Sequence, residues 1–169
     1  MEAMDAILSR RSIRKYKAEP VPEKVRIALL TCAMSAPSAS NRQPWQFVVI
    51  NDRSTLNEVS KLNIYYEMLK DASFAIAVCG DLQADQNNGF WVQDCSAATQ
   101  NILIVAQAKG LGAVWLGIYP NEYRVSGIRK HLALPEHIIP LSVVAIGYPA
   151  EKKPPSNRYD PSRIHYDQW

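Results

Sequence analysis

The chain has 169 residues, of which 47% are hydrophobic and 21% are charged, a balance typical of one globular domain with a sizeable core. Its formal net charge of +3 is too small and too scattered to indicate nucleic-acid binding by itself, although it suits a phosphorylated ligand. No signal-like stretch opens the chain, and no apolar run approaches the roughly 18 residues that span a bilayer, so we expect a soluble, cytoplasmic protein.

The first chemically distinctive segment is Arg10-Arg11-Ser12-Ile13-Arg14, which follows a short stretch of helical spacing. If this segment is extended, Arg10, Ser12 and Arg14 share one face, and Arg11 and Ile13 point the other way. Guanidinium forks and a hydroxyl are donors that match phosphate oxygens. The segment therefore predicts a phosphate cradle, and a solvated basic knuckle is the alternative.

Periodicity predicts helices and strands along the rest of the chain. Helical spacing covers residues 2–9, 22–36, 51–61, 63–71, 90–109 and 120–131. Apolar and β-branched runs predict strands over 45–50, 72–79, 113–118 and 141–148. Because two helices precede the first strand, the order favours an α+β or three-layer α/β sandwich over a Rossmann start. In the second helix, we expect an inward face made of Ile27, Ala28, Leu30 and Thr31.

The segment from Ser35 to Phe47 is rich in hydroxyl, amide and turn-forming residues, and it runs directly into the first predicted strand. Pro, Ser and Asn favour tight turns with exposed backbone donors. A loop of this kind, fixed in place by a buried strand, usually carries function. An ordinary connection is the alternative.

Two segments suggest a second subunit. The helix over 90–109 is apolar around most of its circumference, so we infer that part of it meets a partner, with a purely internal core helix as the alternative. From Pro149 onward the chain is proline-rich and basic, which predicts an extended tail. Its apolar residues, Ile164, Tyr166 and Trp169, lead us to expect that it lies across the partner subunit.

Several catalytic motifs are missing. The chain has no GxSxG, Walker loop or HExxH, and no GxGxxG follows a predicted strand. Cys32, Cys79 and Cys95 form no CxxC and have no histidine at zinc spacing, so we interpret them as small buried hydrophobic residues. A chain with phosphate-binding features but no acid–base set suggests that a cofactor supplies the reactive group.

Four motifs in order resemble the FMN-dependent nitroreductase family: RRSIR near the N-terminus, APSASNRQPWQF before the first strand, AVWLGI in the third strand, and a late GYP before a basic tail. The resemblance covers nearly the whole chain. It implies a single domain over residues 1–169 with a three-layer α/β/α fold and a mainly antiparallel central sheet. It further implies a homodimer whose tails, residues 150–169, are exchanged, and which binds FMN at the interface.

The resemblance also implies roles for particular residues. Arg10, Ser12 and Arg14 would hold the FMN phosphate and ribityl end, with Arg11 at the polar edge of the ring. The partner subunit would line the isoalloxazine with Pro37, Ser38, Ala39, Ser40 and Asn41, which Gln43 would join. Trp115, Leu116 and Gly117 would lie under the ring, with a backbone N–H near Leu116–Gly117 facing flavin N5. Arg158 would close on the phosphate, with Lys152 or Lys153 as weaker candidates, and Asn63 would touch the pyrimidine edge.

The activity implied is ping-pong transfer of hydride from NADH or NADPH, through flavin N5, to nitroaromatic, quinone or similar small acceptors. The connection from Asp81 to Gly89 is short where larger members carry a roof, which implies a comparatively open pocket. Tyr65, Tyr66 and Phe90 are candidates for a partial lid, with a core role as the alternative for each.

Two other classes of function stay open at this point. The first is a flavin-binding carrier or sensor, or a flavin reductase-like protein, that does not turn over nitro compounds. The second is a small basic nucleic-acid binder that uses RRSIR and the tail, which would bind with salt-sensitive affinity and be colourless when pure. We expect neither nucleic acid nor a membrane as a partner.

Overall fold

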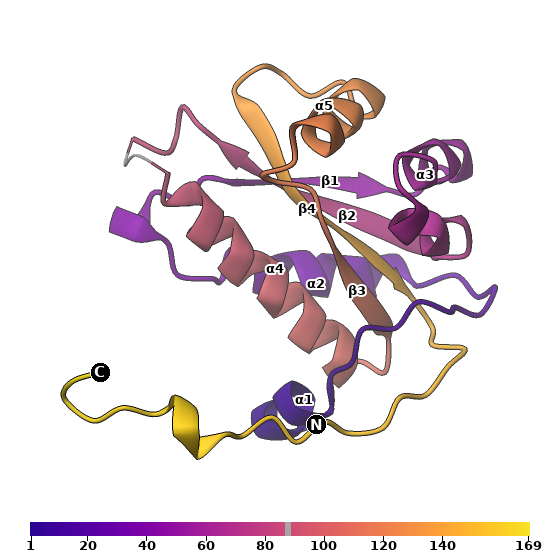
Figure 1. Cartoon of the computed structure of the whole chain (residues 1–169). Helices are drawn as coiled ribbons and strands as arrows, with labels where there is room; N and C mark the ends of the chain where they lie inside the picture. The colour runs from indigo at the N-terminus through magenta and orange to yellow at the C-terminus, as the bar shows by residue number, and fades with distance from the viewer. Residues whose placement is uncertain (87–88) are drawn as a thin grey trace.

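The computed structural model describes residues 1–86 and 89–169, and it is built around one four-stranded sheet (Figure 1). The strands are β1 (Trp45–Ile50), β2 (Phe74–Asp81), β3 (Gly112–Gly117) and β4 (Ile138–Gly147). Their order across the sheet is β1-β2-β4-β3, and each neighbouring pair is antiparallel. The two central strands are buried along almost their whole length, which explains their near-continuous apolar sequences.

Helices cover both faces of the sheet (Figure 1). On one face α2 (Glu23–Met34) and α4 (Trp91–Ala108) share a core with Phe74, Ile76 and Ile146 of the central strands. On the other face α3 (Arg53–Ser60), the 3-10 helix η2 (Ile64–Lys70) and α5 (Glu122–His131) pack on Ala75, Ala77 and the facing side of β4. A three-layer fold with an antiparallel sheet is therefore confirmed.

Two local expectations are wrong. In α2 the buried residues are Leu29 and Ala33, whereas Ile27 is 56% exposed, so the inward face is rotated from the expected one. β4 begins three residues earlier than expected and includes Pro140. Proline has no N–H for the ladder, and the pairing of β2 with β4 shifts register at Val78/Cys79, next to the place where Cys79 pairs with Pro140.

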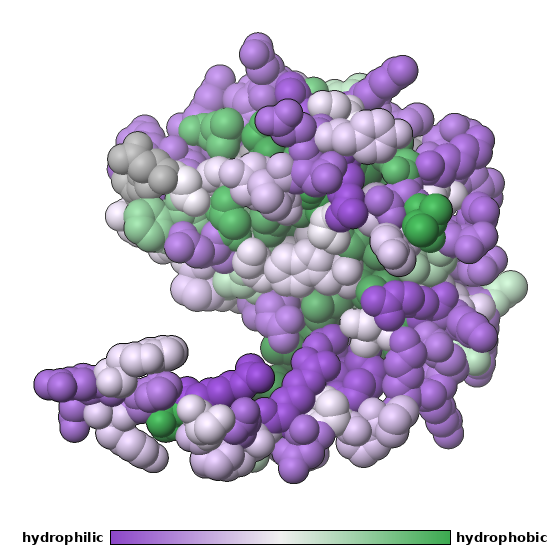
Figure 2. Space-filling model, viewed as in Figure 1, coloured by the Kyte–Doolittle hydropathy of each residue, from purple (hydrophilic) through white to green (hydrophobic). Residues whose placement is uncertain are grey.

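The chain begins with α1 (Ala3–Ser9) and ends in a tail that stands clear of the body (Figures 1 and 2). The tail is extended except for one 3-10 turn, η3 (Pro161–Arg163), which begins at a proline. Its aromatic residues are exposed, and Trp169 has no contact that reduces its accessible surface. Apolar side chains of this kind stabilise a protein only when another surface buries them.

The cysteines are free thiols, and Cys79 and Cys95 are buried as expected, with Cys32 half-buried. In the described part of the chain, no group of three or more His, Cys, Asp or Glu side chains could hold a metal ion. Across residues 1–86 and 89–169, no helix combines the length and the apolar character that crossing a membrane requires.

Candidate functional site

The predicted phosphate cradle, residues 10–14, is an extended segment laid beside the first residues of the edge strand β3. Ser12 forms a parallel bridge with Ala113, whose carbonyl accepts a hydrogen bond from the N–H of Ile13 at 3.0 Å. Ile13 is buried against Gly112, where a Cβ would come within 2.6 Å of its side chain. Burying Ile13 fixes which way the alternating side chains of the segment point.

Three arginines gather at this end of the molecule. The pKa of the Arg10 guanidinium is lowered, mainly by burial. The positive charges of Arg158 and then Arg11 lower it further. None of the three is in an ion pair with a carboxylate among the described residues. Like charges held together without counter-charges repel one another, so the group favours an anion. The tail residue Arg158 therefore lies close enough for its charge to act on Arg10.

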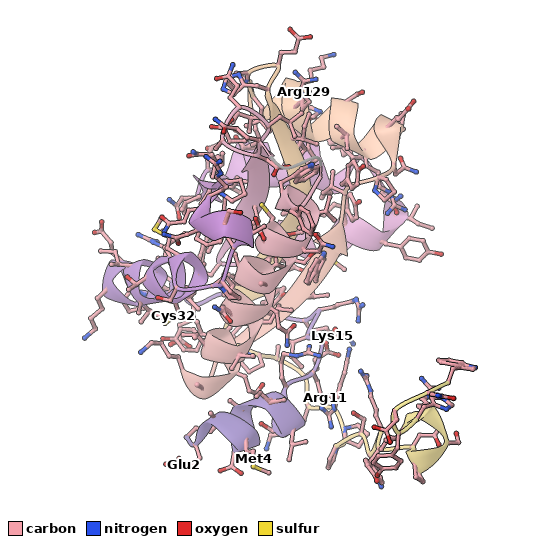
Figure 3. All side chains as sticks on the ribbon, turned by 90° about the vertical axis from the view of Figure 1, so that its left-hand side faces the viewer. Glu2, Met4, Arg11, Lys15, Cys32 and Arg129 are labelled. Atoms are coloured by element: carbon pink, nitrogen blue, oxygen red, sulfur yellow. The ribbon has the colours of Figure 1, made fainter. Side chains whose placement is uncertain are left out.

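Arg11 lies between the end of α1 and the start of the tail (Figure 3). Its Nε donates to the carbonyl of Pro154 at 2.8 Å, and its Nη1 donates to the carbonyl of Leu8 at 2.9 Å. Its Nη2 is buried and has no hydrogen-bond partner within the described residues. Arg11 therefore lies on the same face of the segment as Ile13 and holds the start of the tail through its hydrogen bond to Pro154. Its role at the flavin ring stays a prediction.

The first residues of the tail are tied to the cradle by contacts that sequence reasoning missed. The N–H of Ala150 donates to the carbonyl of Lys15 at 2.8 Å, and a Glu151 carboxylate oxygen accepts from the N–H of Arg14 at 2.6 Å. The Lys153 ammonium donates to the carbonyl of Ser12 at 2.5 Å. The cradle is thus clamped between β3 and the base of the tail. No motif signals these pairs, since they join residues more than 130 positions apart.

An open hollow of about 520 Å³ lies next to this clamp. Arg14 and Lys15 line it from the cradle side, and Tyr65 and Met68 of η2 line it from the other. The Arg14 side chain is exposed at its edge. Arg11 and Ile13 instead line a separate hollow of about 320 Å³, as the alternation of an extended segment requires.

The second half of the predicted site consists of Pro37 to Asn41 and Gln43, and most of these residues lie in the largely exposed turn 38–43. This turn is held in an unusual backbone conformation. Ser40, Asn41 and Gln43 have φ values of 50°, 54° and 51°, in the left-handed region that non-glycine residues rarely adopt. Such strain persists only where surrounding contacts enforce it, and it is commonest at functional sites. Here the Ser38 hydroxyl accepts from the Gln43 N–H at 3.0 Å.

Asp94 of α4 provides the second restraint, and sequence reasoning missed it. Its carboxylate is 5% exposed, and Oδ1 accepts from the N–H of Ala39 at 3.0 Å. Oδ2 is buried and has no hydrogen-bond partner among the described residues. Asp94 is the only acidic residue of α4, and it lies on a buried side that is apolar except for Thr99, which is the signal that could have identified it.

The two half-sites lie near opposite ends of α4. Asp94, near its start, holds the 38–43 turn, and Gln107, near its end, donates to the Ser9 hydroxyl just before the cradle at 3.1 Å. Gln107 lies thirteen positions after Asp94 in the helix, which corresponds to about 20 Å at 1.5 Å per residue. One subunit therefore does not bring the turn and the cradle into a single compact pocket.

The third predicted element, Trp115 to Gly117, forms the end of β3 at the outer edge of the sheet. Leu116 is buried, and Trp115 is half-buried against the α2/α4 core. The N–H of Ile118 donates to Leu141 of β4 at 3.0 Å. Because backbone groups alternate along a strand, the N–H of Gly117 points away from β4, toward the open edge.

Gly117 differs from every other glycine in the chain. A Cβ at Gly80, Gly112, Gly127 or Gly147 would meet another side chain at 3.0 Å or less, and Gly89 and Gly110 have positive φ. At Gly117 a Cβ would have nothing within 4 Å, and φ is not positive. Nothing inside this subunit requires a glycine there. A residue without a side chain at an open strand edge is typical of close approach by a ligand.

The remaining candidates lie on η2 and the connection before α4. The Asn63 side chain accepts from the Tyr65 N–H at 2.9 Å as the N-cap of η2, so its carbonyl oxygen is already used. Tyr66 is a core residue, 2% exposed, and the aromatic rings of Tyr65 and Phe90 are exposed. Residues 87 and 88 of the short connection lie outside the described residues.

Comparison with known proteins gives consistent matches. The model of the Nitroreductase family matches residues 7–63 and 56–148. A protein of Methanothermobacter thermautotrophicus, provisionally named NADH dehydrogenase/NAD(P)H nitroreductase, is 48% identical over all of this chain and 88% of its own length. A crystal structure from Parabacteroides distasonis with the same provisional name has a TM-score of 0.95 at 42% identity, covering 99% of this chain and 98% of that one. A provisionally named nitroreductase from Desulfovibrio desulfuricans, solved in complex with FMN, has a TM-score of 0.87 at 30% identity, covering 100% and 98%.

Proposed function

This chain belongs to the nitroreductase family, and on that premise we propose that it is an FMN-dependent oxidoreductase. It passes electrons from NADH or NADPH through bound FMN to nitroaromatic, quinone or similar small acceptors. The family membership supports an oxidoreductase, and relatives named as NAD(P)H nitroreductases or solved with FMN support the cofactor and the donor. The residues of this chain supply independent support.

Gly117 carries the proposal. Its N–H points out of the sheet at an open edge, and the space that a side chain would fill is empty. A flat ring can therefore approach the backbone of β3 there and accept a hydrogen bond from that N–H. A backbone donor needs no titrating side chain, which agrees with the absence of an acid–base motif in the sequence.

The cradle fits the phosphate end of FMN. Arg10 and Arg158 lie together without a carboxylate partner, and a dianionic phosphate would relieve their repulsion. Ser12 is bridged to Ala113, and Gly117 lies four positions further along β3, about 13 Å at 3.3 Å per residue. The edge of β3 thus runs from the phosphate end to the ring end of one extended ligand.

The site is complete only in a homodimer. In one subunit the 38–43 turn and the cradle lie near opposite ends of α4, too far apart to contact the same flavin ring. In this proposal the turn therefore lines the flavin that is held by the partner subunit. The exposed tail, residues 150–169, crosses onto the partner and buries its aromatic side chains there, while residues 1–169 form a single domain. The cofactor residues that we assign are Arg10, Arg11, Ser12, Arg14, Pro37, Ser38, Ala39, Ser40, Asn41, Gln43, Asn63, Trp115, Leu116, Gly117 and Arg158.

When bound, FMN would supply the redox chemistry, which is hydride transfer from the nicotinamide to the acceptor. The residues of the chain bind and orient: the cradle holds the phosphate, the edge of β3 holds the ring, and the strained turn shapes the far side. Since donor and acceptor meet the same face in turn, the expected kinetics are ping-pong. The exposure of Tyr65 and Phe90 supports an open pocket and broad acceptor use.

The test is an absorption spectrum of the purified protein, followed by steady-state oxidation of NADH and NADPH with a nitroaromatic or a quinone. We expect a yellow dimer with about one FMN per subunit, turnover with both acceptors, and parallel lines in double-reciprocal plots. Bound FMN that is reduced but never reoxidised by these acceptors would support the carrier or sensor instead. A folded, colourless protein that takes up no FMN in excess would refute the proposal.

A further inference from the structure

The carbonyl of Gly117 is held from two sides by residues that no sequence motif identifies. The Tyr66 hydroxyl donates to it at 2.8 Å, and Nη1 of Arg124 donates to it at 3.0 Å. The Arg124 guanidinium also lies over the Tyr66 ring, with its central carbon 5.7 Å from the ring centroid. Three elements, η2, α5 and β3, therefore converge on the peptide at the proposed ring site.

Arg124 is fixed in this position by its own helix. Its backbone N–H donates at 3.0 Å to the side chain of Asn121, the N-cap of α5. The side chain is half-buried, and no carboxylate forms an ion pair with it in residues 1–86 and 89–169. Its side chain contacts the Gly117 carbonyl and the face of the Tyr66 ring, and neither of these groups carries a negative charge.

The hydrogen bonds alone do not explain why the second donor is charged. One neutral donor satisfies a carbonyl, and Tyr66 already provides it at good distance. Burial raises the pKa of the Tyr66 phenol, so that phenol stays a neutral donor. The Arg124 guanidinium adds a full positive charge beside the Gly117 carbonyl. This charge is one peptide group away from the Gly117 N–H, which faces the open edge.

We propose that Arg124 is a positioning residue that fixes the Gly117 peptide and, through its charge, raises the reduction potential of the flavin bound there. This inference rests on the proposed function. A hydride carries two electrons and one proton, so its transfer leaves the nicotinamide with one more positive charge and the flavin ring with one more negative charge. A cation that is half-buried beside the ring stabilises the reduced state more than the oxidised state.

The experiment compares the midpoint potential of bound FMN, measured with a reference redox dye, in Arg124→Gln, Arg124→Lys and Tyr66→Phe. Gln keeps an N–H donor but loses the charge, Lys keeps the charge, and Phe removes the other donor while leaving Arg124. Lys130→Met serves as the control, because it removes a charge from the exposed side of the same helix. Melting curves of the apoproteins show whether each variant folds.

We expect Arg124→Gln to bind FMN with a clearly lower midpoint potential and about tenfold slower reduction by NADH or NADPH. Arg124→Lys should recover most of the potential, and Tyr66→Phe and Lys130→Met should keep it. An unchanged potential in Arg124→Gln, or equal potentials in the Gln and Lys variants, would overturn the inference while leaving the proposed function intact. A wild-type protein that binds no FMN would overturn the proposed function itself and, with it, this inference.

Discussion

The carboxylate of Asp94 accepts a hydrogen bond from the backbone N–H of Ala39, although 55 positions separate them in the chain. This contact ties the start of α4 to the turn that contains three non-glycine residues with positive φ. Left-handed residues of this kind cost about 1–3 kcal/mol each and persist only where their surroundings enforce them. Asp94 is therefore part of what keeps the turn in one shape before any ligand arrives.

Replacing Asp94 should loosen that turn. In Asp94→Ala the N–H of Ala39 loses its acceptor, and we expect a loss of about 1–3 kcal/mol in the free energy of unfolding together with weaker FMN binding. Asp94→Asn keeps a carbonyl oxygen and should fall between wild type and Ala. Chemical denaturation and flavin fluorescence titration measure the two effects. FMN affinity unchanged in Asp94→Ala would show that the turn does not need this anchor.

A methyl group at Gly117 should abolish FMN binding without impairing folding. In Gly117→Ala the new Cβ has open space in the subunit, so stability should be equal or roughly 0.5–1 kcal/mol higher, while FMN is lost. Gly112→Ala is the matched control on the same strand. Its Cβ would meet Ile13 at 2.6 Å, so it should be destabilised by about 1–3 kcal/mol through overpacking. A Gly117→Ala protein that keeps its full complement of FMN would contradict our placement of the ring.

Removing the Arg14 side chain should weaken cofactor binding without unfolding the protein, because that side chain is exposed and its backbone N–H still bonds Glu151. The loss of one charge-assisted hydrogen bond to a phosphate corresponds to about 10- to 100-fold weaker FMN binding. Equilibrium dialysis measures it, with Lys24→Ala, at an exposed position of α2, as the charge-matched control. Equal FMN occupancy in the two variants would argue against the cradle.

Two truncations should separate the roles of the tail. Deleting residues 157–169 removes Arg158 and the exposed aromatic residues, so we expect a weaker dimer and partial loss of FMN, by analytical ultracentrifugation and absorbance. Deleting 150–169 also removes Glu151 and Lys153, which clamp the cradle, so FMN retention should fall further. A monodisperse, fully loaded dimer after the longer deletion would refute tail exchange.

The clamp should also respond to acid. The hydrogen bond from the Arg14 N–H is the main cause that lowers the pKa of Glu151 below its ordinary value of 4.5. A carboxyl group whose pKa is depressed on folding stabilises the native state above its ordinary pKa, and this contribution disappears as the pH falls through the folded value. We therefore expect FMN retention to drop below about pH 4.5 in the wild type. Glu151→Gln should retain less FMN at pH 7 and lose this part of the pH dependence.

Sequence reasoning identified most of the fold from local signals. Helices α3 and α5 lie within the predicted segments 51–61 and 120–131, where Asp52 and Asn121 are their N-caps, and all four strands follow apolar runs. The inward face of α2 was wrong because its residues are apolar on several sides. Packing against α4 and the sheet buries Leu29 and Ala33. Local periodicity alone cannot show that these residues are buried and that Ile27 is exposed.

The sequence by itself determined the elements and predicted the cradle and the polar turn, because side-chain alternation, helix caps and turn chemistry act over a few neighbouring positions. Only the tertiary structure decided that Asp94 holds the turn, that Glu151 clamps the cradle, and that Tyr66 and Arg124 meet on the Gly117 carbonyl. It also decided that α4 keeps the two half-sites apart. These relationships depend on how the layers pack, and packing brings together residues whose separation along the chain leaves no local trace.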